Sequence, residues 1–326
     1  MKRLFGLTLG LLLATPVIAG ELTVYTYDSF NSEWGPGPKL EIAFEEQCAC
    51  DLKFVSSEDG VSILNRLRIE KDLSRADVML GIDDALIEVA RRENLVQAHA
   101  LELEQLQLSL DWQDVDFLPF DFGYFSFVYN SERTAKPVTS LKALVESDAT
   151  VLYQDPRTST PGQGLMLWMK SVFADEAAQA WQTLAGHTLT VTKGWWEAYS
   201  MFLEGDADYV LSYSTSPAYH IITEKKHQYK AALFEEGHIA QVEVAAITRN
   251  SENVALARQF LRFLVSTQAQ EIIPLGNWML PVIDNVDLPA AFDDLIQPRR
   301  IGFTPTEVAE NRKRWIQEWR RSAVRE

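Results

Sequence analysis

Cysteine, histidine and basic residues are scarce in this sequence of 326 residues, and each shortage excludes a class of protein. Two cysteines cannot build a disulfide-rich scaffold, and the five histidines lack the spacing of metal ligands. Only 30 Lys and Arg residues face 46 Asp and Glu residues, whereas binding nucleic acid requires a basic surface. Beyond the N-terminus, no apolar run is long enough to cross a membrane. We therefore expect no metal site, no nucleic-acid partner and no membrane span after the N-terminal segment.

The N-terminus has the layout of a secretory signal peptide. Lys2 and Arg3 precede an apolar run over residues 4–13, and small residues lead to a cleavage point between Ala19 and Gly20. The alternative is a membrane anchor, but the apolar run is shorter than the roughly 20 residues that a spanning helix needs. We expect residues 1–19 to be removed and the mature chain to be secreted to the periplasm.

The two cysteines, Cys48 and Cys50, are separated by one residue. In a secreted chain such a pair is usually oxidised if the geometry allows, although so short a loop contributes little stability. A reactive or metal-binding thiol is the alternative, but no histidine lies nearby.

Alternating hydrophobic patterns predict repeated strand and helix units. Strands are expected at residues 22–27, 51–55 and 76–80, with helices at 39–48 and 61–73 between them. The alternation continues further along the chain, with strands at 150–154, 188–192 and 209–213 and a helix starting at residue 164. This pattern predicts an α/β fold with mixed, mostly parallel sheets flanked by helices, in which ligands bind beyond the carboxyl ends of the strands.

The chain is long enough for two domains. We expect one lobe from residues 20–120 and about 246–326, and a second lobe from residues 121–245. The aromatic segment near 120–129 and the segment near 240–247 are the predicted hinge strands between the lobes.

Aromatic residues recur where strands are expected to end, and such rings can sandwich a flat cationic heterocycle. The alternative is that they pack in the core. The residues concerned are Tyr27, Trp34, Trp195, Tyr213, Tyr219 and Trp278. Asp59 can balance a cationic ring or accept a hydrogen bond from a ligand amino group, or it can be an exposed turn residue.

Hydroxyl groups precede a predicted helix at residues 157–160, which include Ser159 and Thr160. Hydroxyl and backbone N–H groups at a helix start can hold a phosphate, although capping of the helix explains the same residues. A second hydroxyl-rich turn contains Ser214, Thr215 and Ser216. No Ser/His/Asp arrangement or nucleotide-binding fingerprint is present, so no catalytic residues are predicted.

Several long motifs resemble those of the periplasmic thiamine-binding proteins of ABC transporters, which are extracellular solute-binding proteins. The motifs are YTYDSF (25–30), WGPGP (34–38), EDGVS (58–62), YQDPRTSTPG (153–162), VTKGW (191–195), LSYSTSPAYH (211–220) and GNWM (276–279). They follow the family order along nearly the whole mature chain.

The resemblance implies the type II periplasmic binding protein fold, in which two α/β lobes close around a ligand in the cleft between them. It implies that Asp59 and Gly60 hold the aminopyrimidine of the ligand, and that Ser159 and Thr160 meet a phosphate. Trp195 and the turn from Tyr213 to Ser216 complete the pocket. One departure is Trp196, where the family has a small polar residue.

The resemblance also implies a function. The protein would capture thiamine, thiamine monophosphate and thiamine diphosphate and deliver them to an inner-membrane ABC permease, as a monomer that needs no cofactor. Three alternatives remain: a thiaminase that uses a cysteine nucleophile, a polyamine receptor and an iron-binding protein. The cysteines lack a neighbouring base, the hydroxyl-rich loop suits a phosphate better than a polyamine, and no adjacent tyrosine pair suits iron.

Overall fold

The structure is a computed structural model that describes residues 20–323, so the predicted signal peptide lies outside the described residues. Its strands are β1 (Glu21–Tyr27), β2 (Asp51–Ser57), β3 (Val78–Asp83), β4 (Val96–Gln97), β5 (Phe117–Asn130), β6 (Val151–Gln154), β7 (Thr188–Thr192), β8 (Tyr209–Tyr213), β9 (Tyr229–Ala231), β10 (His238–Thr248), β11 (Leu280–Pro281) and β12 (Arg300–Ile301). Its α-helices are α1 (Gly37–Cys48), α2 (Gly60–Glu70), α3 (Ile87–Arg92), α4 (Leu141–Glu146), α5 (Thr160–Phe173), α6 (Ala177–His187), α7 (Trp195–Glu204), α8 (Ser216–Tyr219), α9 (Val254–Leu264), α10 (Thr267–Gly276) and α11 (Pro305–Ala323).

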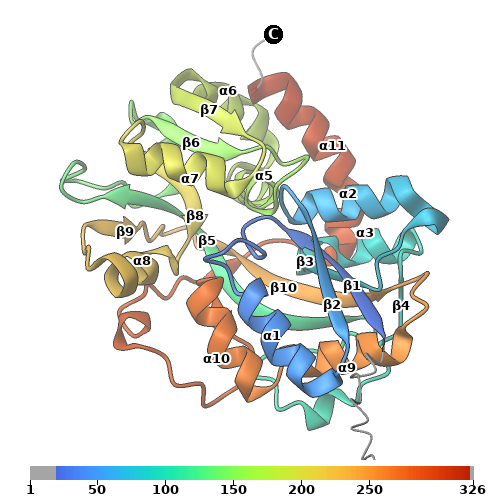
Figure 1. The fold of residues 1–326 in the computed structure, drawn as a ribbon. Coiled ribbons are helices and arrows are strands. Elements are labelled where there is room, and N and C mark those ends of the chain that lie inside the picture. Colours follow the sequence, from blue (N-terminus) through green and yellow to red (C-terminus); the bar gives the residue numbers. More distant parts are fainter. Residues whose placement is uncertain (1–19, 324–326) are drawn as a thin grey trace, which may run out of the picture.

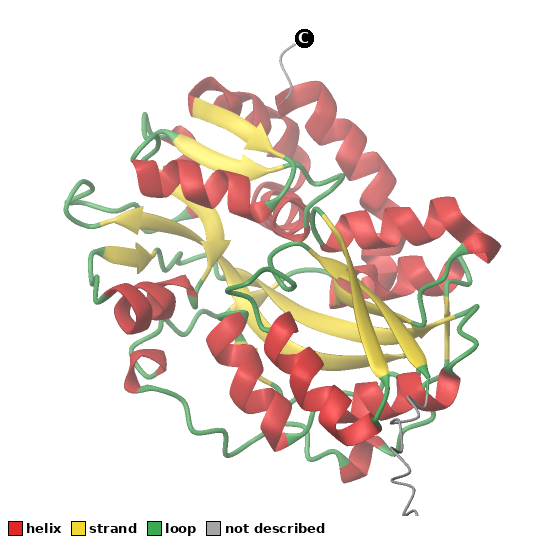
Figure 2. Cartoon of the chain, viewed as in Figure 1, coloured by secondary structure: helices red, strands yellow, loops and turns green. Residues whose placement is uncertain are grey.

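The strands form a mixed sheet in the order β2-β1-β3-β10-β5-β8-β6-β7 (Figure 1). At one end β1 pairs in parallel with β2 and β3, and at the other end β6 pairs in parallel with β7 and β8. The long central strands β5 and β10 are antiparallel to each other. Figure 2 shows that helices surround these strands, as the alternating pattern predicts for an α/β fold.

Two large hydrophobic clusters lie on either side of the central strands. The first takes in the start of β5, including Phe117, and the second contains Phe125 and Phe127 from the same strand. Strand β10 is divided in the same way, with Ile239 in the second cluster and Val242 and residues 244–247 in the first. Both central strands therefore connect the two clusters.

The C-terminal helix differs from its predicted place in the first lobe. Helix α11 contributes Val308, Trp315 and Trp319 to the second cluster, and it also contacts α3 beside the first. It packs against α6 and α5 of the second half and against α3 and the turn at Asp84–Leu86 of the first. The helix thus joins the two halves rather than belonging to the first alone.

Helix α5 also differs from the prediction, because it begins at Thr160 rather than at residue 164. Pro161 and Gly162 suggested a loop. A proline is tolerated in the first turn of a helix, where its missing N–H would have no partner, and Gly162 is needed because a Cβ there would lie 2.2 Å from the carbonyl oxygen of Gln154. The segment over residues 160–163 is therefore helical.

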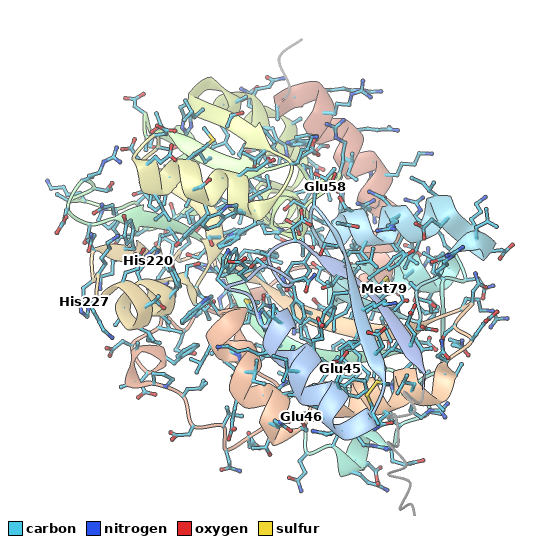
Figure 3. The ribbon with its side chains drawn as sticks, viewed as in Figure 1. Glu45, Glu46, Glu58, Met79, His220 and His227 are labelled. Carbon is cyan, nitrogen blue, oxygen red and sulfur yellow. A yellow bond between two sulfur atoms is a disulfide. The ribbon has the colours of Figure 1, made fainter. Side chains whose placement is uncertain are left out.

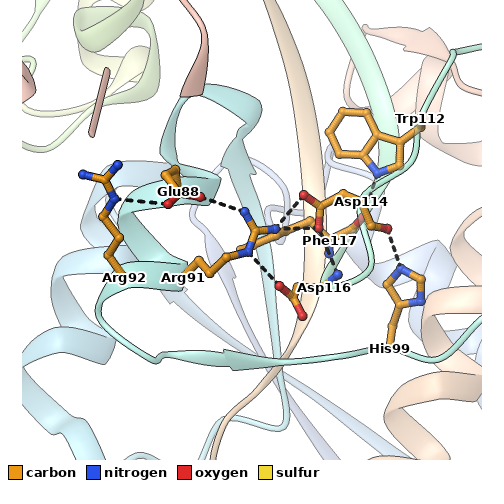
Figure 4. A network of polar contacts seen from close by, with 8 residues as sticks. All are labelled: Glu88, Arg91, Arg92, His99, Trp112, Asp114, Asp116 and Phe117. Atoms are coloured by element: carbon orange, nitrogen blue, oxygen red, sulfur yellow. Dashed lines mark hydrogen bonds and ion pairs between the residues drawn. The ribbon is translucent and has the colours of Figure 1, made fainter. Parts of the chain in front are cut away.

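An ion-pair network fastens the segment before β5 to helix α3 (Figure 4). The guanidinium of Arg91 donates to Asp114 at 2.7 Å, to Asp116 at 2.8 Å and to Glu88 at 2.9 Å. None of these residues lines the ligand cavity described below. The network therefore has a structural role.

Cys48 and Cys50 form a disulfide at the end of α1, just before β2. The bridge lies at the amino end of β2, whereas the cavity residue Asp59 follows the carboxyl end of that strand. Over residues 20–323, no helix combines the length and apolar character that a membrane span requires.

Candidate functional site

A cavity of about 180 Å³ lies between the two hydrophobic clusters, next to the central strands. Residues from both halves of the sheet line it: Tyr27, Ser29, Trp34, Asp59, Gly81, Trp195, Trp196, Tyr199, Tyr213, Ser216, Tyr219, Glu243, Asn277, Trp278 and Met279. Because β1, β2 and β8 all end at this point, the carboxyl ends of the strands define the site.

The structure brings eight of the predicted binding residues to the cavity wall: Tyr27, Trp34, Asp59, Trp195, Tyr213, Ser216, Tyr219 and Trp278. The other five, Gly60, Ser159, Thr160, Ser214 and Thr215, are buried beside it and do not line it. Thr215 contacts the sulfur of Met279 at 3.9 Å, and Met279 itself lines the cavity.

Asp59 links two helix starts that come from different clusters. Its carboxylate accepts a hydrogen bond from the backbone N–H of Gly60 at 2.7 Å, which caps α2. It also accepts from the hydroxyl of Ser159 at 2.7 Å and from the N–H of Thr160 at 3.1 Å, at the start of α5. Burial raises the pKa of Asp59, and these donors oppose that shift because they favour the ionised form.

The approach of the two helix starts requires a glycine at position 60. A Cβ there would lie 2.3 Å from the Thr160 hydroxyl and 2.3 Å from the carbonyl oxygen of Gly81. Gly60 therefore acts through close packing rather than through a direct contact with the cavity.

Trp195 forms one wall of the cavity, and a stack of rings holds it in place. Its indole stacks on Tyr199 with ring centroids 4.8 Å apart, and Tyr199 stacks in turn on His220 at 5.9 Å. The indole N–H donates to the hydroxyl of Ser212 at 2.8 Å. His220 is completely buried, and its Nε2 forms a hydrogen bond of 2.8 Å with the Tyr199 hydroxyl. Figure 3 labels His220 beside the helix α8. A half-buried ring that is fixed on both sides is a preorganised stacking surface.

Trp34 and Trp196 face each other at the rim. Their ring centroids are 5.3 Å apart, and both rings remain about half exposed, at 45% and 49%. Trp34 precedes α1 in the first half of the sheet, whereas Trp196 lies in the first turn of α7 in the second half. The residue that departs from the family pattern thus lies at the cavity rim and not on a remote surface.

An acidic group at the base of the cavity was not predicted. Glu243 of β10 lines the cavity, and its Oε2 is hydrogen-bonded to the Tyr27 hydroxyl at 2.7 Å. Its register partner on β5 is Asp121, which accepts from the side-chain amide of Asn277 at 2.6 Å. Burial and the neighbouring Asp121 hold the pKa of Glu243 well above its usual range, and burial raises the pKa of Asp121 to about 8.

Two features of the sequence indicate this acidic group. Glu243 is the one carboxyl residue in the mostly apolar segment 238–248, and Asn277 is next to the predicted Trp278. A charge in a buried strand costs free energy unless it has partners, so it marks a functional position.

The cavity suits a flat cation. Aromatic rings supply its walls, two carboxyl groups face it, and no Lys, Arg or His is among its lining residues. Within residues 20–323, no three His, Cys, Asp or Glu side chains are grouped to hold a metal ion.

The family model described as "Bacterial extracellular solute-binding protein" matches residues 43–274. The chain belongs to this family, whose members bind ligands and are not enzymes.

Individual relatives and solved structures show which members of the family this chain resembles. The chain is 55% identical to the thiamine-binding periplasmic protein of Salmonella typhimurium over 323 residues, which are 98% of each chain. A solved structure named "Periplasmic thiamin binding protein" superimposes with a TM-score of 0.91 at 54% identity and covers 94% of this chain and 96% of that one. The ferric binding protein from Campylobacter jejuni has a TM-score of 0.77 at 16% identity, covers 93% of this chain and 100% of that one, and shares the fold alone. The predicted fold class is therefore confirmed.

Proposed function

We propose that this protein captures thiamine and its phosphate esters in the periplasm and delivers them to an inner-membrane ABC permease. The observation that carries the proposal is a ring-lined cavity with two carboxyl groups and no basic residue. A thiazolium ring is flat and cationic, so Trp195, Tyr213 and the rings beside them can stack on it while the carboxyl groups balance its charge. The identity to thiamine-binding relatives supports this choice over a polyamine.

The delivery step depends on two lobes that close around the ligand. Residues 20–120 with about 246–304 would form one lobe and residues 121–245 the other, with β5 and β10 as hinges. Ligand contacts from both lobes exist only in the closed form, so binding shifts the equilibrium towards the form that a permease recognises. We further propose that residues 1–19 direct export and are cleaved, and that the mature protein acts as a monomer without a cofactor.

The phosphate esters require a rearrangement. The Thr160 hydroxyl is buried without a partner, whereas the other two donors proposed for phosphate, the Ser159 hydroxyl and the Thr160 N–H, are turned to the Asp59 carboxylate in this structure. A phosphate can use them only if it displaces or shares this carboxylate, because the start of α5 then serves two anions. The phosphate esters should therefore bind only slightly more tightly than thiamine. A helix start whose donors had no other partner would favour the esters more strongly.

Calorimetric titration of refolded mature protein with thiamine, its monophosphate, its diphosphate and spermidine tests the proposal. Refolding removes co-purified ligand. Tight binding of one thiamine compound per chain, with spermidine silent, is the expected result. If folded protein gives no heat of binding with thiamine, or if it binds spermidine equally well, the proposal is overturned.

A further inference from the structure

The hydrogen bonds around Tyr27 set a proton count at the base of the cavity. The Tyr27 hydroxyl lies 2.7 Å from Oε2 of Glu243 and 3.0 Å from the side-chain oxygen of Asn277. It has one proton and can donate to only one of these two oxygens. If Glu243 is ionised, its carboxylate accepts the hydrogen bond from Tyr27. The Asn277 oxygen then receives no hydrogen bond from this hydroxyl.

A protonated Glu243 removes this conflict at the Tyr27 hydroxyl, because both oxygens beside it can then take part in a hydrogen bond. Its own O–H then donates to the Tyr27 oxygen, and Tyr27 donates to the Asn277 oxygen. The amide of Asn277 donates to Asp121 in either case, and the amide of Gln241 donates to Oε1 of Glu243. Because buried polar groups are costly without partners, the hydrogen bonds favour the protonated form.

The titratable groups that face Glu243 supply no positive charge, and its carboxyl neighbours disfavour a second ionised carboxylate. They are carboxyl or phenol groups on every neighbouring element: Tyr27 of β1, Asp59 before α2, Asp83 of β3, Asp121 of β5 and Tyr213 of β8. Glu243 is only 5% exposed, and none of the residues that line the cavity is basic. The free protein thus holds a buried acid with no cation to stabilise its ionised form.

We propose that Glu243 is the counter-charge for the cationic ring of the ligand, and that it gives up its proton when the ligand binds. The inference rests on the proposed function. On binding, the O–H bond of Glu243 breaks, the proton passes to the solvent, and the Tyr27 hydroxyl turns to donate to Oε2. The ligand cation enters the cavity in place of the proton, so the net charge of the site is conserved. Glu243 then selects cations over uncharged rings of the same shape.

Release of a proton makes the affinity for the ligand depend on pH. A nearby cation favours the ionised carboxylate and lowers the pKa of Glu243 in the complex. Between the bound and free values, binding releases up to one proton, so the association constant rises by up to about tenfold per pH unit.

Calorimetry in two buffers tests this step. Thiamine is titrated at pH 7.5 in phosphate and in Tris, whose ionisation enthalpies differ, so the difference in observed heat counts the protons released. Wild-type protein should release close to one proton with thiamine and none with an analogue that has a thiophene ring in place of the thiazolium. Glu243→Gln should abolish the release and weaken thiamine at least tenfold while sparing the analogue. The matched control is Glu204→Gln, which removes an exposed carboxylate from α7.

The outcomes separate the two proposals. The role of Glu243 is overturned if thiamine binds tightly with equal heats in both buffers. It is also overturned if folded Glu243→Gln still releases a proton. Neither result contradicts the proposed function. Absence of thiamine binding overturns the proposed function itself. If the variant does not fold, the comparison of thiamine with the neutral analogue on wild-type protein still decides, because equal proton counts for both refute the inference.

Discussion

The hydroxyl of Ser159 donates a hydrogen bond of 2.7 Å to the carboxylate of Asp59, one hundred positions earlier in the chain. This bond joins the start of α5 to the start of α2. Two parallel contacts lie beside it, because the N–H of Ser62 donates to the carbonyl of Thr158 at 3.1 Å and the amide of Asn65 donates to that of Arg157 at 3.0 Å. The two halves of the molecule are therefore held together next to the cavity by direct polar contacts.

Ser159→Ala should weaken this connection selectively. A hydrogen bond to a charged group contributes about 1.5 to 3 kcal/mol, so loss of the hydroxyl should lower ligand affinity roughly tenfold through the closed form. X-ray scattering of the ligand-free variant should show a larger radius of gyration. Ser200→Ala, whose hydroxyl bonds within α7, is the control. Unchanged affinity and scattering in Ser159→Ala would show that the bond does not govern closure.

The two adjacent tryptophans should differ in their effects. Trp195→Ala removes a fixed stacking surface and should lower thiamine affinity roughly ten- to hundredfold, since a desolvated cation–π contact adds about 2 kcal/mol to lost apolar burial. Trp196→Ala removes a rim contact with Trp34 and should mainly speed dissociation by a few fold. Stopped-flow fluorescence measures both rates.

Leu189→Ala removes a similarly exposed apolar side chain away from the cavity and serves as the control for this pair. An equal loss of affinity in the Trp195 and Trp196 variants would contradict the distinction between wall and rim.

Acidification should destabilise the fold through His238. Its Nδ1 lies 2.7 Å from the Phe125 carbonyl and its Nε2 accepts the N–H of Phe234 at 2.9 Å, so the ring is held in its neutral form. Burial lowers the pKa of His238 to about 4, below the roughly 6.5 of an unfolded chain. The unfolded state binds the extra proton, so this stability is complete above about pH 6.5 and is lost as the pH falls towards 4, by on the order of 3 kcal/mol.

Urea unfolding at several pH values checks this prediction. The free energy of unfolding should fall less steeply with acid in His238→Gln than in wild type, and in the exposed His227→Gln control it should fall as in wild type. Buried carboxyl groups with raised pKa values add the opposite slope in all three proteins and cancel in the comparison. Parallel curves for His238→Gln and wild type would refute the assignment.

Removal of the disulfide should leave binding intact. Cys48→Ser with Cys50→Ser opens a three-residue loop, which costs on the order of 1 to 2 kcal/mol by chain entropy. Thiamine affinity should not change, because the bridge lies at the opposite end of β2 from Asp59. Thermal unfolding and calorimetry measure both effects. A loss of thiamine affinity in the double variant would contradict this prediction.

The sequence predicted the order of strands and helices well because each unit has a clear local pattern. It did not predict α10, since Pro274 lies inside that helix, nor the correct start of α5. The role of Glu243 was hidden for a different reason: its partner Tyr27 is 216 positions away, and no local pattern reports a contact made across the sheet. Asp59 was predicted to face a ligand, whereas its contacts with Ser159 and Thr160 depend on how the two halves approach each other.

The position of helix α11 has a consequence for the synthesis of the protein. The second hydrophobic cluster needs Trp315 and Trp319, and the first needs residues up to Val282, so neither core can be completed until most of the chain has left the ribosome. Until then the nascent chain lacks the burial that would stabilise a compact state. A chain that finishes both cores this late keeps the extended form that export through a channel requires, which agrees with the export signal proposed for residues 1–19.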